Sequence, residues 1–226
     1  MAPQIQRCEF DMPSHTALIG DIKGSRDLDN WPEVFRKLQE TLEEANRRFA
    51  ADILIAFKPT VGDEFQGALK TPDKAYDVYT FIKSSLPVSI YCGMGIGEVE
   101  RPAEGDSGLR GTAFYRAREA LEICKKNKRT LTICLGAERA GSEKIVNTIL
   151  DLVNVIESHW TERQRQIVNY YRLNPDLTYE KLAVYFGVSK PFVHKVLKAT
   201  GFVSLSRSER LISELLAEIP DENGRG

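Results

Sequence analysis

The feature that most constrains the fold is the alternation of strand-like runs with helix-periodic segments over residues 15–136. An apolar run at 15–22 is followed by residues 31–51, in which apolar side chains recur at helical spacing. The pattern then predicts strands at 53–60 and 64–70, a helix at 73–85, a strand at 88–99, a helix at 111–126 and a strand at 130–136. This order, β-α-β-β-α-β-α-β, indicates two βαβ-like halves that share one sheet.

The fold class expected from this order is α+β. An N-terminal ferredoxin-like or palm-like antiparallel sheet would carry helices on one face and leave a more open face for ligands. Residues 142–158 are strongly amphipathic and predict a helix that leads out of the sheet unit. We therefore expect a palm-like domain at 1–140, a connecting helix at 141–158 and an all-α helix-turn-helix domain with a C-terminal helix at 159–226.

Composition excludes several classes of protein. Hydrophobic residues make up 42% of the 226 residues and charged residues 28%, which is typical of a globular chain. No apolar run approaches the roughly 20 residues needed to cross a bilayer, and the N-terminus lacks the apolar core of a signal peptide. The four cysteines are far apart and form no C-x-x-C pair. These features predict a cytoplasmic protein with reduced thiols and no membrane partner.

The C-terminal third contains the pattern of two short helices around a tight turn. Gly187 follows Ala183 by four residues and allows the turn, Val188 fills the space beneath it, and Ser189 can cap the second helix. The pattern resembles the helix-turn-helix of bacterial DNA-binding proteins. The preceding stretch, WTERQRQIVNYY, resembles the first helix of sigma-factor-like modules.

Charge in this region supports the same interpretation. Residues 160–210 carry nine Lys and Arg against four Asp and Glu, although the whole chain has a net charge of −1. A local positive excess on a near-neutral protein is the expected footprint of a DNA-binding module. The main expectation is a DNA-binding transcriptional regulator, and a helix pair without DNA is the alternative. The candidate DNA-binding residues are Ser189, Lys190, Pro191, His194, Lys195 and Lys198.

Two acidic residues stand at the ends of predicted strands. Asp21 ends the first strand in GDIKGS, and Asp63 lies in the hairpin turn VGDEF. Because the first strand of this topology runs beside the hairpin, the two carboxylates could meet and hold Mg²⁺, with waters and substrate phosphates as further ligands. Glu64 is a third candidate, although it would point to the opposite face if the strand has already begun there. A charged hairpin tip and an Asp that only caps backbone amides are the alternative.

The motifs around these acids resemble nucleotide cyclases. GDIKGS is similar to the class III cyclase pattern after the first strand, and PTVGDEFQGAL resembles both the cyclase hairpin and the GGDEF motif of diguanylate cyclases. YCGMGIGEVE and GTAFYRAREALEICKK resemble the strand and the helix that follow. With the C-terminal helix-turn-helix pattern, the combination resembles the SatD family. The resemblance implies Mg²⁺ or Mn²⁺ at Asp21 and Asp63, and a nucleoside triphosphate or cyclic nucleotide as partner.

Several cations and turn residues are candidates to bind that nucleotide. The positions at which cyclases place an Asn and an Arg in the last helix are Tyr115 and Glu119 here, which leaves Arg116 or Arg118 as a substitute. Backbone N–H groups of the GDIKGS turn could hold phosphate. The nucleotide-binding candidates are Lys23, Gly24, Ser25, Arg26, Lys58 and Arg116.

Three functions are compatible with these observations. A regulator whose cyclase-like domain senses nucleotide or metal is the preferred interpretation. A divalent-metal-dependent nucleotidyl cyclase or transferase with a DNA-binding module is the alternative, and a structural dimerisation domain is the third.

A final helix is expected to begin at Ser206, with Glu209 at capping-box spacing. The apolar helix faces at 145–156 and 211–219 predict a homodimer.

Overall fold

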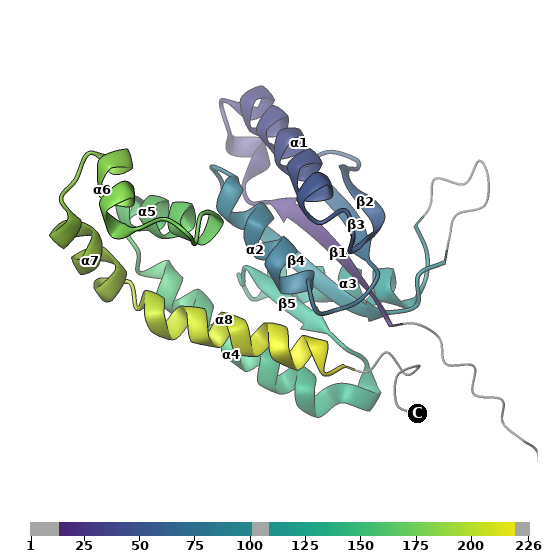
Figure 1. Ribbon diagram of the computed structural model, residues 1–226. Helices are drawn as coiled ribbons and strands as arrows, with labels where there is room; N and C mark the ends of the chain where they lie inside the picture. Colours follow the sequence, from purple (N-terminus) through teal and green to yellow (C-terminus); the bar gives the residue numbers. More distant parts are fainter. Residues whose placement is uncertain (1–13, 101–108, 220–226) are drawn as a thin grey trace, which may run out of the picture.

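In the computed structural model of the protein, which describes residues 14–100 and 109–219, five strands form one sheet in the order β2-β3-β1-β4-β5 (Figure 1). The central strand β1 pairs antiparallel with β3 and β4, β2 and β3 form an antiparallel hairpin, and β5 lies parallel to β4. The strands are β1 (His15–Ile22), β2 (Ile53–Pro59), β3 (Glu64–Leu69), β4 (Ile90–Gly97) and β5 (Leu131–Cys134). The predicted element order and the α+β class are confirmed.

Eight α-helices complete the described part of the chain. Three of them alternate with the strands, and five follow β5 in sequence. They are α1 (Trp31–Arg48), α2 (Ala75–Ser85), α3 (Thr112–Lys126), α4 (Ala140–Ser158), α5 (Glu162–Leu173), α6 (Tyr179–Phe186), α7 (Lys190–Ala199) and α8 (Phe202–Ala217). Short 3₁₀ turns at Ser25–Asp27 and Ala137–Arg139 precede α1 and α4.

Both faces of the sheet are covered, which corrects the expectation of an open face. Side chains alternate along β1, so that Leu18 joins the core beneath α1 and α2, whereas Ala17 joins a second core beneath α3. Glycines on β4 allow the backbone of α3 to lie against the sheet. A Cβ atom on Gly95 would stand 2.2 Å from the Ala113 carbonyl oxygen, and one on Gly93 would stand 2.1 Å from the Ala117 carbonyl oxygen.

The helical part is joined to the sheet part by α8. This helix packs along α4 and α2 (Figure 1), and Ile212 and Leu216 belong to the same core as Leu18. Trp160, Ile167 and other side chains of α4 to α8 form a smaller core of their own. A separate helix-turn-helix domain is therefore not shown, and the boundaries at 140 and 158 stay predictions.

A buried ion-pair network ties four helices together. Glu157 of α4 pairs with Lys83 of α2, and it accepts a hydrogen bond from Arg172 of α5 at 2.8 Å. Arg172 also donates to Glu209 of α8 at 2.7 Å. Burial alone would raise the pKa of Glu157, but the charges of Lys83 and Arg172 lower it to about 2. The sheet part and the helical part are thus joined by charge as well as by apolar contact.

The turn between α6 and α7 agrees with its sequence. Gly187 adopts a left-handed conformation with φ +62°, and the Ser189 hydroxyl accepts a hydrogen bond from the Phe192 N–H. Within the described residues, no helix is both long and apolar enough to span a bilayer. Cys92, Cys124 and Cys134 are buried free thiols, and Cys8 lies outside the described residues.

Candidate functional site

Strand pairing brings the predicted acidic residues to one end of the sheet. Asp21 on β1 stands opposite Glu64 of β3 on one side and Tyr91 of β4 on the other. Asp63 directly precedes β3, and its carbonyl oxygen accepts a hydrogen bond from the Ile22 N–H at 3.3 Å. The three acids therefore lie together where β1 ends, because an antiparallel neighbour of β1 must begin there.

A lysine from α3 is the counter-ion of Asp21. The Lys125 Nζ donates to the Asp21 Oδ2 at 2.7 Å and lies 3.7 Å from the Glu64 Oε1. Burial raises the pKa of Asp21; the Lys125 ammonium opposes this shift, and the charges of Asp63 and Glu64 reinforce it. The pKa of Asp21 is raised in sum, so one lysine does not fully offset the burial and the neighbouring acids.

The other two acids have partners of their own. The Ser25 hydroxyl, in the turn after β1, donates to the Asp63 Oδ2. The Arg118 Nη1 lies 2.8 and 2.9 Å from the two carboxylate oxygens of Glu64. Gly24 makes the turn possible with φ +66°. Asp63 is thus oriented by the turn, whereas Glu64 is held by α3.

The cations predicted to face the acids lie elsewhere. Lys23 stacks over the Tyr91 ring at 4.3 Å from its centroid. Arg116 donates to the Ile96 carbonyl oxygen at 2.6 Å, near the far end of β4, and also to Glu138. Lys58 is exposed on β2, and Arg26 is exposed in the turn. None of these four side chains forms an ion pair with Asp21 or Asp63 within the described residues.

Two cations of α3 do reach the acids: Arg118, which the sequence offered beside Arg116 as a substitute, and Lys125, which sequence reasoning missed. They are seven residues apart on α3, which places them on one face of the helix two turns apart. That spacing was visible in GTAFYRAREALEICKK, but nothing local to the sequence shows which face of α3 meets the sheet.

Asp21 and Asp63 suit a metal ion that binds together with a nucleotide, which supplies further ligands. The described residues include no group of three or more His, Cys, Asp or Glu that could hold a metal ion by themselves. Mg²⁺ in nucleotide sites is commonly held by one or two carboxylates, with phosphates and waters completing the octahedron. Asp21 and Asp63 could supply these carboxylates, and the Lys125 ammonium supplies positive charge there in the described structure.

Together, the sheet topology and the acids at the end of β1 define a palm-like α+β protein. The chain belongs to the SatD family, whose model matches residues 15–216. No curated protein matches the sequence.

Three solved structures match part of the chain. A bacterial light-regulated adenylyl cyclase matches with 16% identity and a TM-score of 0.40, over 53% of this chain and 74% of that one. The diguanylate cyclase SiaD from Pseudomonas aeruginosa, solved with its activator SiaC, matches with 16% identity and a TM-score of 0.42, over 55% and 50%. An adenylate cyclase from Trypanosoma brucei matches with 15% identity and a TM-score of 0.39, over 48% and 67%. This chain thus spans about half the length of the diguanylate cyclase chain.

These comparisons correct the main functional prediction. The expectation of a DNA-binding transcriptional regulator is wrong as the main interpretation: the three structures above are nucleotide cyclases, and none of them supports DNA binding. The six residues expected to contact DNA are exposed on and just before α7, and Lys190 forms an ion pair with Glu180. Exposed lysines are equally typical of an ordinary solvent-facing helix, which is why charge and a turn motif misled the prediction.

Proposed function

We propose that the protein is a divalent-metal-dependent nucleotide-binding enzyme of the nucleotidyl cyclase or transferase class. The observation that supports the proposal most is the end of β1, where Asp21 stands opposite Glu64, Asp63 directly precedes β3 and accepts a hydrogen bond from the Ile22 N–H, and Lys125 is the counter-ion of Asp21. The motif resemblance to class III cyclases in the same strand and hairpin supports the nucleotide as substrate. We place the activity in the cytoplasm, since the buried cysteines are free thiols.

Each side chain around the end of β1 has a proposed role in binding the metal or the nucleotide. Asp21 and Asp63 would hold Mg²⁺ or Mn²⁺, which when bound offsets phosphate charge. Ser25 orients Asp63 by its hydrogen bond. Backbone N–H groups of the turn from Gly24 to Arg26 are candidates to receive phosphate oxygens. Lys125 and Arg118 carry positive charge beside the acids and could contact phosphate once the acids are otherwise engaged.

The chemistry proposed is attack of a ribose hydroxyl oxygen on the α-phosphorus of a nucleoside triphosphate. The new oxygen–phosphorus bond forms as the bond to the bridging oxygen breaks, pyrophosphate leaves, and the hydroxyl proton passes to solvent.

Pyrophosphate release tests this activity. The protein is incubated with ATP or GTP and Mn²⁺ or Mg²⁺, and nucleotide products are separated by chromatography. We expect pyrophosphate release in the wild type and its loss in Asp63→Asn, while Asp176→Asn, at an exposed acid between α5 and α6, serves as the matched control. No release with either nucleotide, or equal release in Asp63→Asn, would contradict the enzyme proposal.

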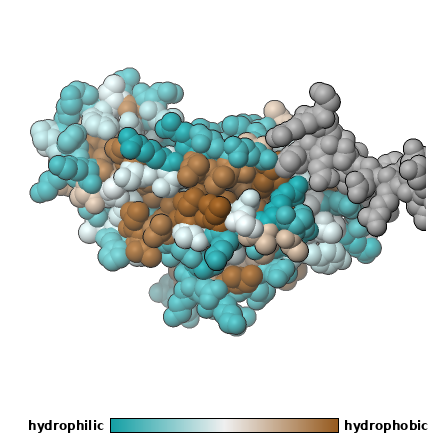
Figure 2. All heavy atoms as spheres, turned by 90° about the horizontal axis from the view of Figure 1, so that it is seen from below, coloured by the Kyte–Doolittle hydropathy of each residue, from teal (hydrophilic) through white to brown (hydrophobic). Residues whose placement is uncertain are grey.

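We also propose that a second copy of this chain covers an apolar surface on α4 and α8. The predicted faces at 145–156 and 211–219 are only partly used inside the molecule, where Val146 and Leu150 meet Ile212 and Leu216. Figure 2 shows apolar side chains gathered on this side of the molecule. The residues left exposed are Ile145, Leu152, Val155, Ile156, Val203 and Leu211.

Sedimentation tests the homodimer. Leu152 is 61% exposed, so Leu152→Asp places a charge on the surface without entering the core. We expect a dimer in the wild type and a monomer in Leu152→Asp at micromolar concentration, because burying an unpaired charge at an interface is unfavourable. A monomeric wild type would contradict the proposal.

A further inference from the structure

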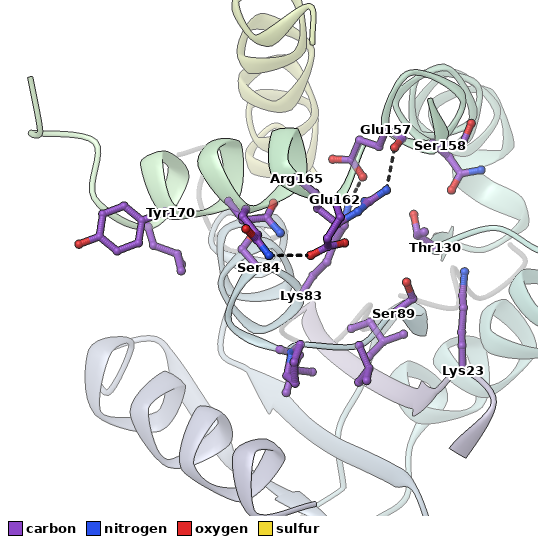
Figure 3. Close-up of a pocket in the computed structure, with 18 of the residues that line it drawn as sticks. Lys23, Lys83, Ser84, Ser89, Thr130, Glu157, Ser158, Glu162, Arg165 and Tyr170 are labelled. Carbon is purple, nitrogen blue, oxygen red and sulfur yellow. Dashed lines mark hydrogen bonds and ion pairs between the residues drawn. The ribbon is translucent and has the colours of Figure 1, made fainter. Parts of the chain in front are cut away.

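A second hollow lies beyond the end of β1, at the same end of the sheet as the acid pair. Its volume is about 670 Å³, within the range of small-molecule sites. The strand ends and the loop after α3 form one wall, and the ends of α2 and α4 with α5 form the other (Figure 3). Asp21, Asp63 and Glu64 do not line it, so it is a different site from the one proposed above.

The lining carries more positive than negative charge. Four cations line the pocket (Lys23, Lys83, Lys128 and Arg165), against the two acids Glu157 and Glu162. Glu157 is already bound by Lys83 and by Arg172. Arg165 donates to the Glu157 carbonyl oxygen at 3.0 Å, which leaves its charge without a carboxylate partner in the described part of the chain. The excess positive charge favours an anionic ligand.

Lys23 is the cation best placed to meet that ligand. Its ammonium group points into the pocket beside Ser89 and Thr130 (Figure 3). Its side chain contacts the Tyr91 ring, and no carboxylate of the described residues lies within ion-pair distance. A bound anion would give the Lys23 ammonium group the charged partner that it lacks among the described residues.

Lys128 lies on the pocket rim, two residues after the end of α3. Its left-handed conformation, with φ +56°, belongs to the C-terminal cap of that helix, in which the Lys128 N–H donates to the Lys125 carbonyl oxygen and the Arg129 N–H to the Cys124 carbonyl oxygen. The cap thus places a third lysine on the pocket.

The opposite end of the pocket is aromatic. Tyr170 stacks on Tyr185 with ring centroids 3.9 Å apart, and Phe186 meets Tyr170 edge-on. All three line the pocket. Aromatic rings beside a cationic wall suit a ligand with a planar base at one end and phosphate at the other, because bases stack on aromatic faces.

We propose that this pocket binds a nucleoside monophosphate without a metal ion, with phosphate at Lys23, Lys128 and Arg165 and the base against Tyr170 and Tyr185. Because Glu157 and Lys83 also join the sheet part to the helical part, a ligand here would contact both parts of the molecule. The proposal does not depend on the nucleotidyl transfer activity proposed above.

Calorimetric titration with AMP, GMP and inorganic pyrophosphate in excess EDTA tests the pocket. EDTA chelates divalent metal ions and so prevents metal-dependent binding at Asp21 and Asp63. We expect AMP or GMP to bind the wild type, with affinity reduced about tenfold or more in Lys23→Gln and in Lys128→Asn, because each removes a charge-assisted hydrogen bond. Asparagine tolerates the left-handed conformation at position 128 better than most residues. Lys126→Gln, an exposed lysine at the end of α3 that does not line the pocket, is the matched control and should bind as the wild type does.

Asp63→Asn should also bind AMP or GMP normally, which separates this site from the acid pair. No binding of either monophosphate at millimolar concentration would overturn the proposal, and so would equal affinities in wild type, Lys23→Gln and Lys128→Asn. Pyrophosphate that binds as tightly as the monophosphates would overturn the role of the aromatic rings.

Discussion

The buried network around Glu157 makes a quantitative prediction for the variant Glu157→Gln. The pKa of Glu157 is about 2, against an ordinary value of 4.5. A difference of about 2.5 pH units, at about 1.4 kcal/mol each, corresponds to about 3 kcal/mol of folding free energy at neutral pH. The side chain is only 4% exposed, so solvent screening takes little from this figure. It agrees with the roughly 3–5 kcal/mol lost when one partner of a buried ion pair is removed.

The same pKa fixes how the effect depends on pH. Because the folded-state pKa lies below the unfolded one, the contribution of Glu157 is fully present above about pH 4.5 and is lost as the pH falls toward 2. Glu209 acts in the opposite sense, since burial raises its pKa and protonation therefore favours the folded state. Subtracting the stability of Glu157→Gln from that of the wild type at each pH isolates the Glu157 contribution.

Urea unfolding at pH 7, 4.5 and 3 measures this difference. We expect Glu157→Gln to be less stable by about 3 kcal/mol at pH 7, with the gap narrowing below pH 4.5. Glu44→Gln, which breaks an exposed pair with Arg47, is the control and should cost less than about 1 kcal/mol. A loss below about 1 kcal/mol at pH 7 in Glu157→Gln, or a gap that does not change with pH, would refute the reasoning.

Two further predictions concern α3. Gly95→Ala should lower the melting temperature strongly, because the added Cβ would lie 2.2 Å from backbone atoms of Ala113 and Ala117, and overpacking costs about 1–3 kcal/mol or more. Gly141→Ala, with nothing within 4 Å, is its control, and equal melting temperatures would show that α3 does not press on β4. Lys125→Gln should raise the pKa of Asp21 further, since that lysine is its hydrogen-bonded counter-ion. An unchanged pKa of Asp21 in an NMR titration would show that Lys125 is not its counter-ion.

Periodicity was sufficient to predict the order of the elements and the meeting of Asp21 with Asp63. The hydrophobic pattern distinguishes strands from helices, and β1 must run beside the hairpin once that order is fixed. The sequence did not predict that α3 covers the second face of the sheet. The role of Gly93 and Gly95 becomes visible only when α3 is packed against them. Side-chain partners were missed for a similar reason: Lys125 lies 104 residues from Asp21 in sequence.

The C-terminal part shows where local signals mislead. The spacing of Ser206 and Glu209 predicted a helix start, but α8 begins at Phe202 after Gly201. Glu209 instead pairs with Arg172, and Ser206 donates to the Phe202 carbonyl oxygen. A glutamate that caps a helix and a glutamate that forms a buried ion pair look the same in a sequence. Only the packing of α8 against α2 and α5 shows which of these two roles Glu209 has.

The central claim, that Asp21 and Asp63 bind a metal together with a nucleotide, is tested most directly by isothermal titration of ATP or GTP in Mn²⁺. Mn²⁺ should bind weakly alone and more tightly with the triphosphate, whose oxygens fill the remaining coordination positions. Asp63→Asn should abolish this metal-dependent binding and keep the melting temperature of the wild type, because a partly exposed turn residue contributes little to stability. Equal heats for the wild type and a folded Asp63→Asn would contradict the claim and leave VGDEF as a charged hairpin tip.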